Sequence, residues 1–157
     1  MTQIATSLWF ASQAEEAARF YCATIPGAVL GEIIRIPPGG PGPEGGVLLV
    51  EFNLNGTPML AMNGNPGEPF TNAVSLSALC ADQAELDRVW DALLQGGQPQ
   101  ACGWLKDRFG VAWQLVPEAL PRLMKAGDAA QRGRVVAALM RMVKIDAAAL
   151  EAAFHAA

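Results

Sequence analysis

The sequence predicts an α+β fold in which two βαβββ modules form a curved sheet around a ligand-sized cavity, followed by a helical tail. Two observations carry this prediction. The same order of strand and helix patterns occurs twice, over about residues 3–63 and 73–117. Residues 118–157 then change to a helical pattern. We therefore treat residues 1–117 as one two-module domain and residues 118–157 as a helical C-terminal extension.

The first module has clear start and stop signals. Ser12 is followed three residues later by Glu15, which is the pattern of a capping box at the start of a helix. Asn55-Gly56 lies between two apolar runs and indicates a tight hairpin. Residues 37–46 contain four Pro and five Gly and predict a loop, either a mobile lid or an edge loop. The elements expected in order are a strand at 4–10, a helix ending near residue 24, and strands at 29–36, 47–54 and 58–63.

The second module repeats this order less clearly. Asp82 and Glu85 repeat the capping pattern, and Gly96-Gly97 marks the end of the helix. In the tail, Asp128 and Asp146 are expected helix N-caps. The elements expected in order are a strand at 73–80, a helix at 82–95, a short strand-like stretch at 99–105 and a strand at 111–116, and the module can also be read as β-α-β-β-β with two short middle strands.

The composition favours a soluble cytoplasmic protein. Hydrophobic residues make up 52% of the chain and charged residues 17%, which is enough apolar material for a core. No apolar run is long enough to span a bilayer, and the N-terminus lacks a signal-peptide pattern, so no membrane partner is expected. The three cysteines are widely spaced and form no Cys-x-x-Cys pair, which favours a reducing compartment. The tail holds six basic and four acidic residues, interspersed as on a solvated helix face, so no nucleic-acid partner is expected.

Several short runs resemble the vicinal-oxygen-chelate superfamily, which has the glyoxalase and bleomycin-resistance fold. Within it the chain is similar to the PhnB-like branch, often labelled 3-demethylubiquinone-9 3-methyltransferase. The resemblance covers about residues 3–117, and one fold of this kind hosts many chemistries. The runs that carry it are Leu8-Trp9-Phe10, Ala14-Glu15-Glu16-Ala17, Phe20-Tyr21, Val50-Glu51-Phe52, Asn55-Gly56, Met62-Asn63-Gly64, Cys102-Gly103-Trp104-Leu105-Lys106-Asp107, Phe109-Gly110 and Trp113-Gln114.

The resemblance implies a place for a divalent metal, but the residues there do not suit one. Superfamily enzymes hold the metal with His, Glu or Gln on four strands, and the matching positions fall near Thr6, Met59, Ser75 and Gln114. Transition metals prefer imidazole, thiolate or carboxylate ligands. The chain has a single histidine, His155, close to the C-terminus. We therefore expect neither a bound metal nor another cofactor.

Two side chains could have chemical roles. Glu51 is the one acid within a clear strand, and a carboxylate lining a cavity can have a raised pKa and act as a base. An exposed or paired strand glutamate is the favoured alternative. Cys102 lies near Lys106, but no histidine is available as a base, so a structural cysteine is the preferred interpretation. No catalytic residue can be named. The expected ligand-binding residues are Trp9, Glu51, Met59, Trp104, Trp113 and Gln114.

Three functions remain in competition, and the sequence does not decide whether the protein is an enzyme. The leading hypothesis is a PhnB-like cavity protein that binds a small apolar organic molecule without metal. The second is a metal-dependent lyase, isomerase or dioxygenase of the same superfamily. The third is a methyltransferase like that of the label, although no glycine-rich strand-to-helix turn for S-adenosylmethionine exists. A homodimer is also expected, because the apolar helical tail and the open sheets need covering.

Overall fold

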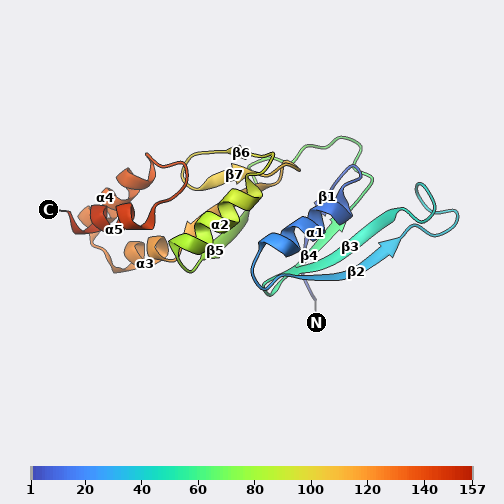
Figure 1. Cartoon of the computed structure of the whole chain (residues 1–157), viewed down its shortest axis with the longest axis horizontal. Coiled ribbons are helices and arrows are strands. Elements are labelled where there is room, and N and C mark those ends of the chain that lie inside the picture. Colours follow the sequence, from blue (N-terminus) through green and yellow to red (C-terminus); the bar gives the residue numbers. More distant parts are fainter. Residues whose placement is uncertain (1, 157) are drawn as a thin grey trace. The chain divides into compact units, whose positions relative to one another are not determined.

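The computed structural model describes residues 2–156 and divides the chain into two compact units, the first ending at Pro69 and the second beginning at Phe70 (Figure 1). Each unit contains a four-stranded mixed sheet with one parallel pair of strands. This confirms the predicted α+β class and its two βαβββ-type halves. Among the described residues, no helix is both long and apolar enough to cross a bilayer.

Unit 1 contains sheet A, whose strand order is β1-β4-β3-β2, and helix α1. The parallel pair is β1 with β4, and the other two pairings are antiparallel. The elements are β1 Thr6–Trp9, α1 Ala14–Thr24, β2 Val29–Arg35, β3 Val47–Leu54 and β4 Thr57–Met62. The hairpin between β3 and β4 turns at Asn55 and Gly56, whose φ angles are 48° and 95°, as the Asn-Gly pair predicts.

Sheet A buries one face against α1. The cross-strand pairs Val50↔Ala61 and Phe52↔Met59 lie on this face, and each of these side chains is at least 96% buried. The Tyr21 ring of α1 packs against Phe52 with ring centroids 6.3 Å apart. Because side chains alternate along a strand, the residues between them point to the opposite face, here called the open face of sheet A.

The start of α1 differs from the prediction. The helix begins at Ala14 with Gln13 as its N-cap, so Ser12 is not the cap. Instead, the side-chain oxygen of Asn63, beyond the end of β4, accepts a hydrogen bond from the Ala14 amide at 2.9 Å. A distant amide side chain thus replaces the local capping box and joins the helix start to the sheet.

Unit 2 contains sheet B, of order β5-β8-β7-β6, and four helices. Its elements are β5 Leu76–Cys80, α2 Gln83–Leu93, β6 Gln98–Pro99, β7 Trp104–Lys106, β8 Ala112–Pro117, α3 Ala119–Ala126, α4 Ala129–Leu139 and α5 Ala147–His155. The two short middle strands expected in this module are β6 and β7, which are separated because Cys102 and Gly103 adopt φ angles of 60° and 81° and turn the chain. The N-caps Asp82, Asp128 and Asp146 are confirmed, each accepting a hydrogen bond from a first-turn amide.

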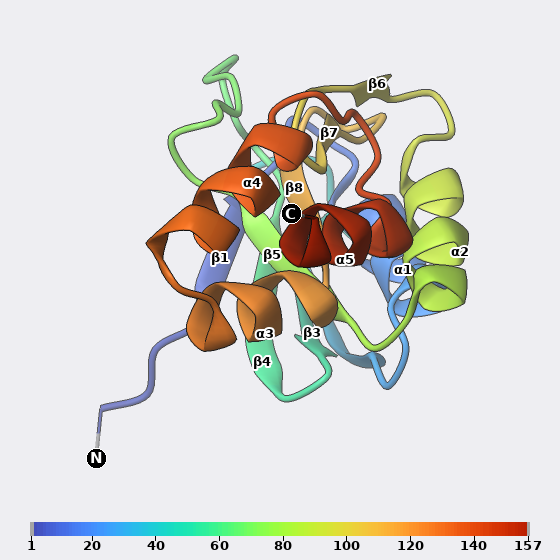
Figure 2. The same cartoon turned by 90° about the vertical axis from the view of Figure 1, so that its left-hand side faces the viewer.

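The three C-terminal helices lie together in unit 2 (Figure 2). Backbone hydrogen bonds join the turn before β7 to the segment after α4, from the Cys102 amide to the Met142 carbonyl and from the Gly103 amide to the Val143 carbonyl, both 2.8 Å. The Gln83 side chain of α2 donates to the Ile145 carbonyl at 3.1 Å and accepts from the Ala147 amide at 2.9 Å. The helical extension is thus bonded to both the sheet and α2.

Candidate functional site

The open face of sheet A carries a partly exposed apolar surface. Glu51, an exposed acidic side chain on this face, lies across from Leu60 of β4. Trp9 of β1 is 40% exposed, and its indole N–H donates to the Asn63 carbonyl at 3.3 Å. The aliphatic residues that share this face are Ile34, Leu49, Leu60 and Met62. The face therefore offers apolar contact area beside a carboxylate.

In sheet B, Leu105, Trp113 and Leu115 are buried on one face, and the opposite face, here called the open face of sheet B, is more polar. The Gln114 side-chain amide donates to the Ser75 hydroxyl at 2.8 Å. Trp104 of β7 is the cross-strand partner of Gln114 and is partly exposed. Ser77 pairs with Gln114 from the other side and is also exposed. This face combines an indole ring with hydrogen-bonding groups.

Two of the predicted ligand-binding residues lie in the cores. Met59 is 1% exposed on the α1 side of sheet A, on the opposite face from Glu51. Trp113 is 2% exposed, and its indole N–H donates to the buried Asp107 carboxylate at 2.9 Å. Within unit 1 the structure brings Trp9 and Glu51 onto one face, and within unit 2 it brings Trp104 and Gln114 onto one face. Met59 and Trp113 belong to neither.

The positions implied for a metal by the superfamily resemblance do not form a ligand set. Thr6 and Met59 are cross-strand partners, and Met59 is buried on the α1 face. Ser75 and Gln114 are hydrogen-bonded to each other. Hydroxyl, thioether and amide groups bring no negative charge to a divalent cation. In residues 2–156, no three His, Cys, Asp or Glu side chains gather as a metal would require. The residues present therefore do not fit the metal that the superfamily implies.

The cysteines are free thiols in different surroundings. Cys80 is 2% exposed, and burial, with a smaller contribution from Glu85, raises the pKa of its thiol to about 11. Burial also raises the pKa of Cys22 in α1. The Cys102 sulfur lies 3.8 Å from the Met140 sulfur, at the surface of unit 2. A raised pKa disfavours the nucleophilic thiolate, so Cys22 and Cys80 are suited to packing and not to nucleophilic chemistry.

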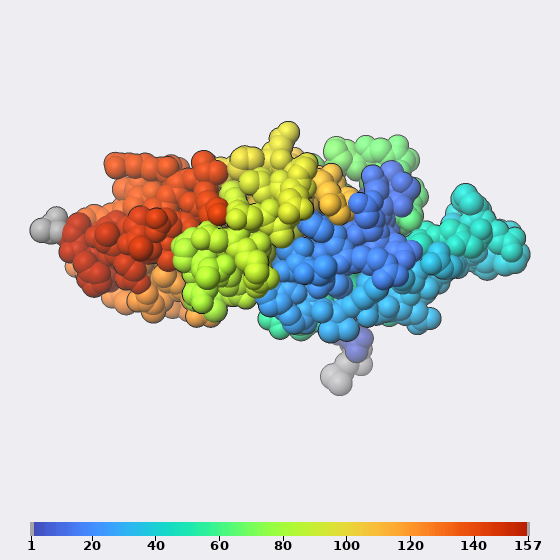
Figure 3. Space-filling model, in the orientation of Figure 1, coloured from blue at the N-terminus to red at the C-terminus, as the bar shows by residue number. Residues whose placement is uncertain are grey.

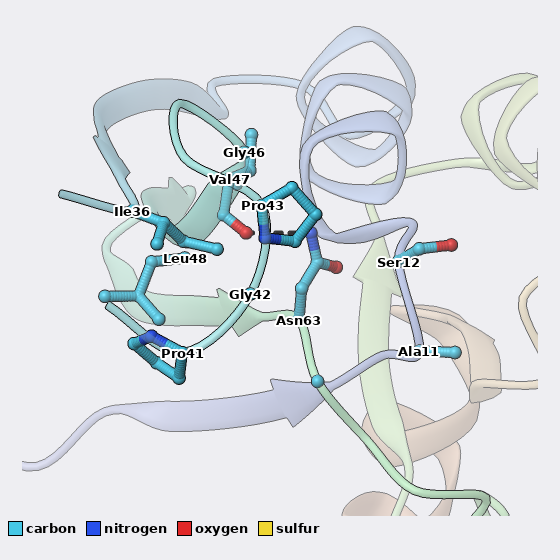
Figure 4. Close-up of a pocket in the computed structure, with 11 residues that line it drawn as sticks. Ala11, Ser12, Ile36, Pro41, Gly42, Pro43, Gly46, Val47, Leu48 and Asn63 are labelled. Carbon is cyan, nitrogen blue, oxygen red and sulfur yellow. Dashed lines mark hydrogen bonds between the residues drawn. The ribbon is translucent and has the colours of Figure 1, made fainter. Parts of the chain in front are cut away.

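Sequence reasoning missed a pocket on the α1 side of sheet A. The loop of residues 37–46 projects from the ends of β2 and β3 (Figure 3) and folds over the buried Ile36 side chain. Between this loop and the start of α1 lies a pocket of about 360 Å³ (Figure 4). Its lining residues are Ala11, Ser12, Ile36, Pro41, Gly42, Pro43, Gly46, Val47, Leu48, Asn63 and Gly64. The Pro- and Gly-rich composition predicts the loop but not the packing that closes it over Ile36.

The comparisons with known proteins agree with this fold. The family model for 3-demethylubiquinone-9 3-methyltransferase matches residues 2–116. No curated protein sequence matches the chain at a significant level.

Solved structures give the same result. The PhnB protein from Bacillus cereus is 34% identical with a TM-score of 0.68, over 74% of this chain and 99% of that one. Protein PA1353 from Pseudomonas aeruginosa is 26% identical with a TM-score of 0.61, over 75% and 98% of the two chains. The fosfomycin resistance protein FosX from Listeria monocytogenes, in its Mn(II) and sulfate complex, is 13% identical with a TM-score of 0.53, over 73% and 89%, and shows the shared fold alone. The chain therefore belongs to the 3-demethylubiquinone-9 3-methyltransferase family of PhnB-like proteins.

Proposed function

We propose that this PhnB-like protein binds a small, largely apolar organic molecule on the open faces of its sheets, without a metal ion. The observation that carries the proposal is the open face of sheet A. There Trp9, Leu49, Leu60 and Met62 are partly exposed instead of packed beneath a helix of unit 1. Burying exposed apolar area is favourable by about 25 cal/mol per Å², so such a face is a ready contact surface for an apolar molecule.

The polar groups on these faces can orient the ligand by forming hydrogen bonds with it. Glu51 stands among aliphatic side chains on sheet A, and Gln114 lies beside Trp104 on sheet B. Ligand sites commonly combine apolar walls with a few polar groups that select one pose. We expect the ligand to carry at least one hydrogen-bonding group on a mainly apolar body.

A neutral fluorescent dye tests the proposal on sheet A. N-phenyl-1-naphthylamine should gain fluorescence on binding the wild-type protein. Leu60→Glu places a second carboxylate beside Glu51 and should weaken binding about tenfold or more, since a charge disfavours apolar contact. Val74→Glu is the matched control, because Val74 is also an exposed apolar residue but precedes β5 in unit 2. Equal binding by both variants would contradict the site on sheet A.

Tryptophan substitutions test sheet B. Trp104 is partly exposed, whereas Trp113 is buried and hydrogen-bonded to Asp107. Ligand-dependent changes in intrinsic fluorescence should therefore depend more on Trp104→Phe than on Trp113→Phe. The reverse result would place the ligand away from the open face of sheet B.

Two other activities have direct tests. A metal-dependent enzyme would retain zinc, nickel, iron or manganese near one per chain after dialysis, as measured by elemental analysis. A methyltransferase would bind S-adenosylmethionine, which calorimetry measures. We expect neither, because the metal positions lack charged ligands and the Phe10–Gln13 link between β1 and α1 contains no glycine.

A further inference from the structure

We propose that the pocket between the 37–46 loop and the start of α1 is a second binding site, which takes a compact, neutral, hydrocarbon-like molecule. It lies on the α1 side of sheet A, away from the open face. Leu48 lines it and lies two and four residues before Val50 and Phe52, so its side chain faces α1 as theirs do. The adjacent Leu49 points to the open face. The pocket is therefore independent of the function proposed above.

The walls of the pocket are held by the loop's own hydrogen bonds. The Ile36 amide donates to the Gly46 carbonyl at 2.8 Å, and the Gly45 amide donates to the Ile36 carbonyl at 3.0 Å. Two further backbone hydrogen bonds close turns within the loop. The Gly40 amide donates to the Pro37 carbonyl and the Gly46 amide donates to the Pro43 carbonyl, each at 3.0 Å. Because the loop is already ordered, ligand binding carries a smaller entropic cost for ordering it.

The volume and the surfaces suit a small apolar body. About 360 Å³ lies at the lower end of the range for ligand pockets, roughly 300–1,000 Å³. The segment Pro41-Gly42-Pro43 lies across the pocket from Ala11 and Ser12, with Asn63 between them (Figure 4). Prolines present apolar rings and no amide donor, so this side of the pocket favours carbon over polar groups.

The charges around the pocket select a neutral molecule. None of the eleven lining residues is charged. The positive end of the α1 dipole disfavours a cation, and Glu15 and Glu16 in the first helical turn disfavour an anion. The Asn63 amide is already engaged, accepting from the Ala14 amide at 2.9 Å and donating to the Val47 carbonyl at 3.1 Å. The pocket therefore selects by shape and apolar contact.

An arginine links the loop to the helix. The Arg35 guanidinium donates to the Gly45 carbonyl at 3.1 Å and lies 3.6 Å from the Glu15 carboxylate. It lies outside the lining set and holds the loop near α1. Arg35→Ala should loosen the loop and weaken binding without removing a wall residue.

Toluene is the probe, observed by the backbone amide signals of the intact ¹⁵N-labelled protein. The expected result is a saturable shift of the Gly42, Gly46 and Gly64 amides. Leu48→Trp fills the pocket and should weaken toluene binding at least tenfold. Leu49→Trp is the matched control, since it adds the same ring one residue away on the opposite face, and it should leave the shift unchanged.

Three outcomes would overturn the proposal. The first is no saturable shift of these glycines up to the solubility limit of toluene. The second is a shift confined to the open-face amides of Glu51 and Leu60, which would support the open-face site alone. The third is equal loss of binding in both tryptophan variants. If Leu48→Trp does not fold, Pro43→Ala decides the matter, because Pro43 is exposed and its loss should remove one wall and weaken binding severalfold.

Discussion

At the residue scale, Asp107 explains why the run from Cys102 to Gln114 is so distinctive. Its carboxylate is 97% buried and accepts from the Phe109 and Val111 amides at 2.9 and 3.0 Å and from the Trp113 indole at 2.9 Å. The carboxylate organises the turn between β7 and β8 and anchors a core tryptophan. The run is therefore a structural motif, and Trp104, Lys106 and Gln114 within it alternate onto the open face.

Asp107→Asn should lower the free energy of unfolding by about 2 kcal/mol, because the new amide group opposes the Trp113 indole N–H donor inside the core. Urea denaturation measures the loss. In a Trp113→Phe background, where that donor is absent, the same substitution should cost less, by about 1 kcal/mol. Identical costs in both backgrounds would show that the indole hydrogen bond has no energetic role.

The Cys80 thiol should make stability sensitive to alkaline pH. Burial raises its pKa from 9.0 to about 11, so the unfolded chain loses this proton before the folded protein does. Stability is then lost as the pH rises through this window. Urea denaturation at pH 8 and pH 10 should show a smaller drop for Cys80→Ala than for the wild type. A drop of the same size in both proteins would contradict this assignment.

At the scale of elements, the turns at Gly56 and Gly103 differ in how tightly the glycine is packed. Gly56 and Gly103 both have positive φ angles, 95° and 81°. A Cβ at Gly56 would meet nothing within 4 Å, whereas one at Gly103 would lie 2.7 Å from both the Leu115 carbonyl oxygen and Ile145. The turn before β7 is therefore limited by packing as well as by backbone conformation.

Gly56→Ala should cost about 1–2 kcal/mol, the backbone penalty alone. Gly103→Ala should cost clearly more, since the added methyl group also collides with a strand and with Ile145. Thermal or urea unfolding of the two variants gives the comparison. Equal losses would mean that the segment after α4 moves aside without cost.

The same scale shows what the sequence could predict. Alternation, caps and the Asn-Gly pair were enough for the order of strands and helices. They did not settle which face of a strand is buried, because a shift of one residue reverses the faces. Met59 is expected at the ligand from the family resemblance and Trp113 as an aromatic residue of a strand, and the structure buries both side chains in the cores. The cap from Asn63 was also invisible, since 49 residues separate it from Ala14.

At the scale of the whole molecule, we predict a homodimer. Val136, Met140 and Val143 are 41%, 67% and 51% exposed on or just after α4, and the open sheet faces add further apolar area. Sedimentation velocity at micromolar concentration should give the mass of two chains. Met140→Glu should shift the protein toward monomer, whereas Ala129→Glu, at the other end of α4, should not. A wild-type monomer at high micromolar concentration would contradict the prediction.

The hydrogen bonds from Cys102 and Gly103 to the segment after α4 also affect how the chain opens. These amides exchange with solvent only when the C-terminal segment detaches, because their acceptors are the Met142 and Val143 carbonyls. The ties from Gln83 to Ile145 and Ala147 extend the same linkage to α2. The extension and sheet B should therefore behave as one foldon in native-state hydrogen exchange, with a shared opening free energy. Cleavage by a protease between α4 and α5 would then report the same opening free energy when opening and closing are fast relative to cleavage.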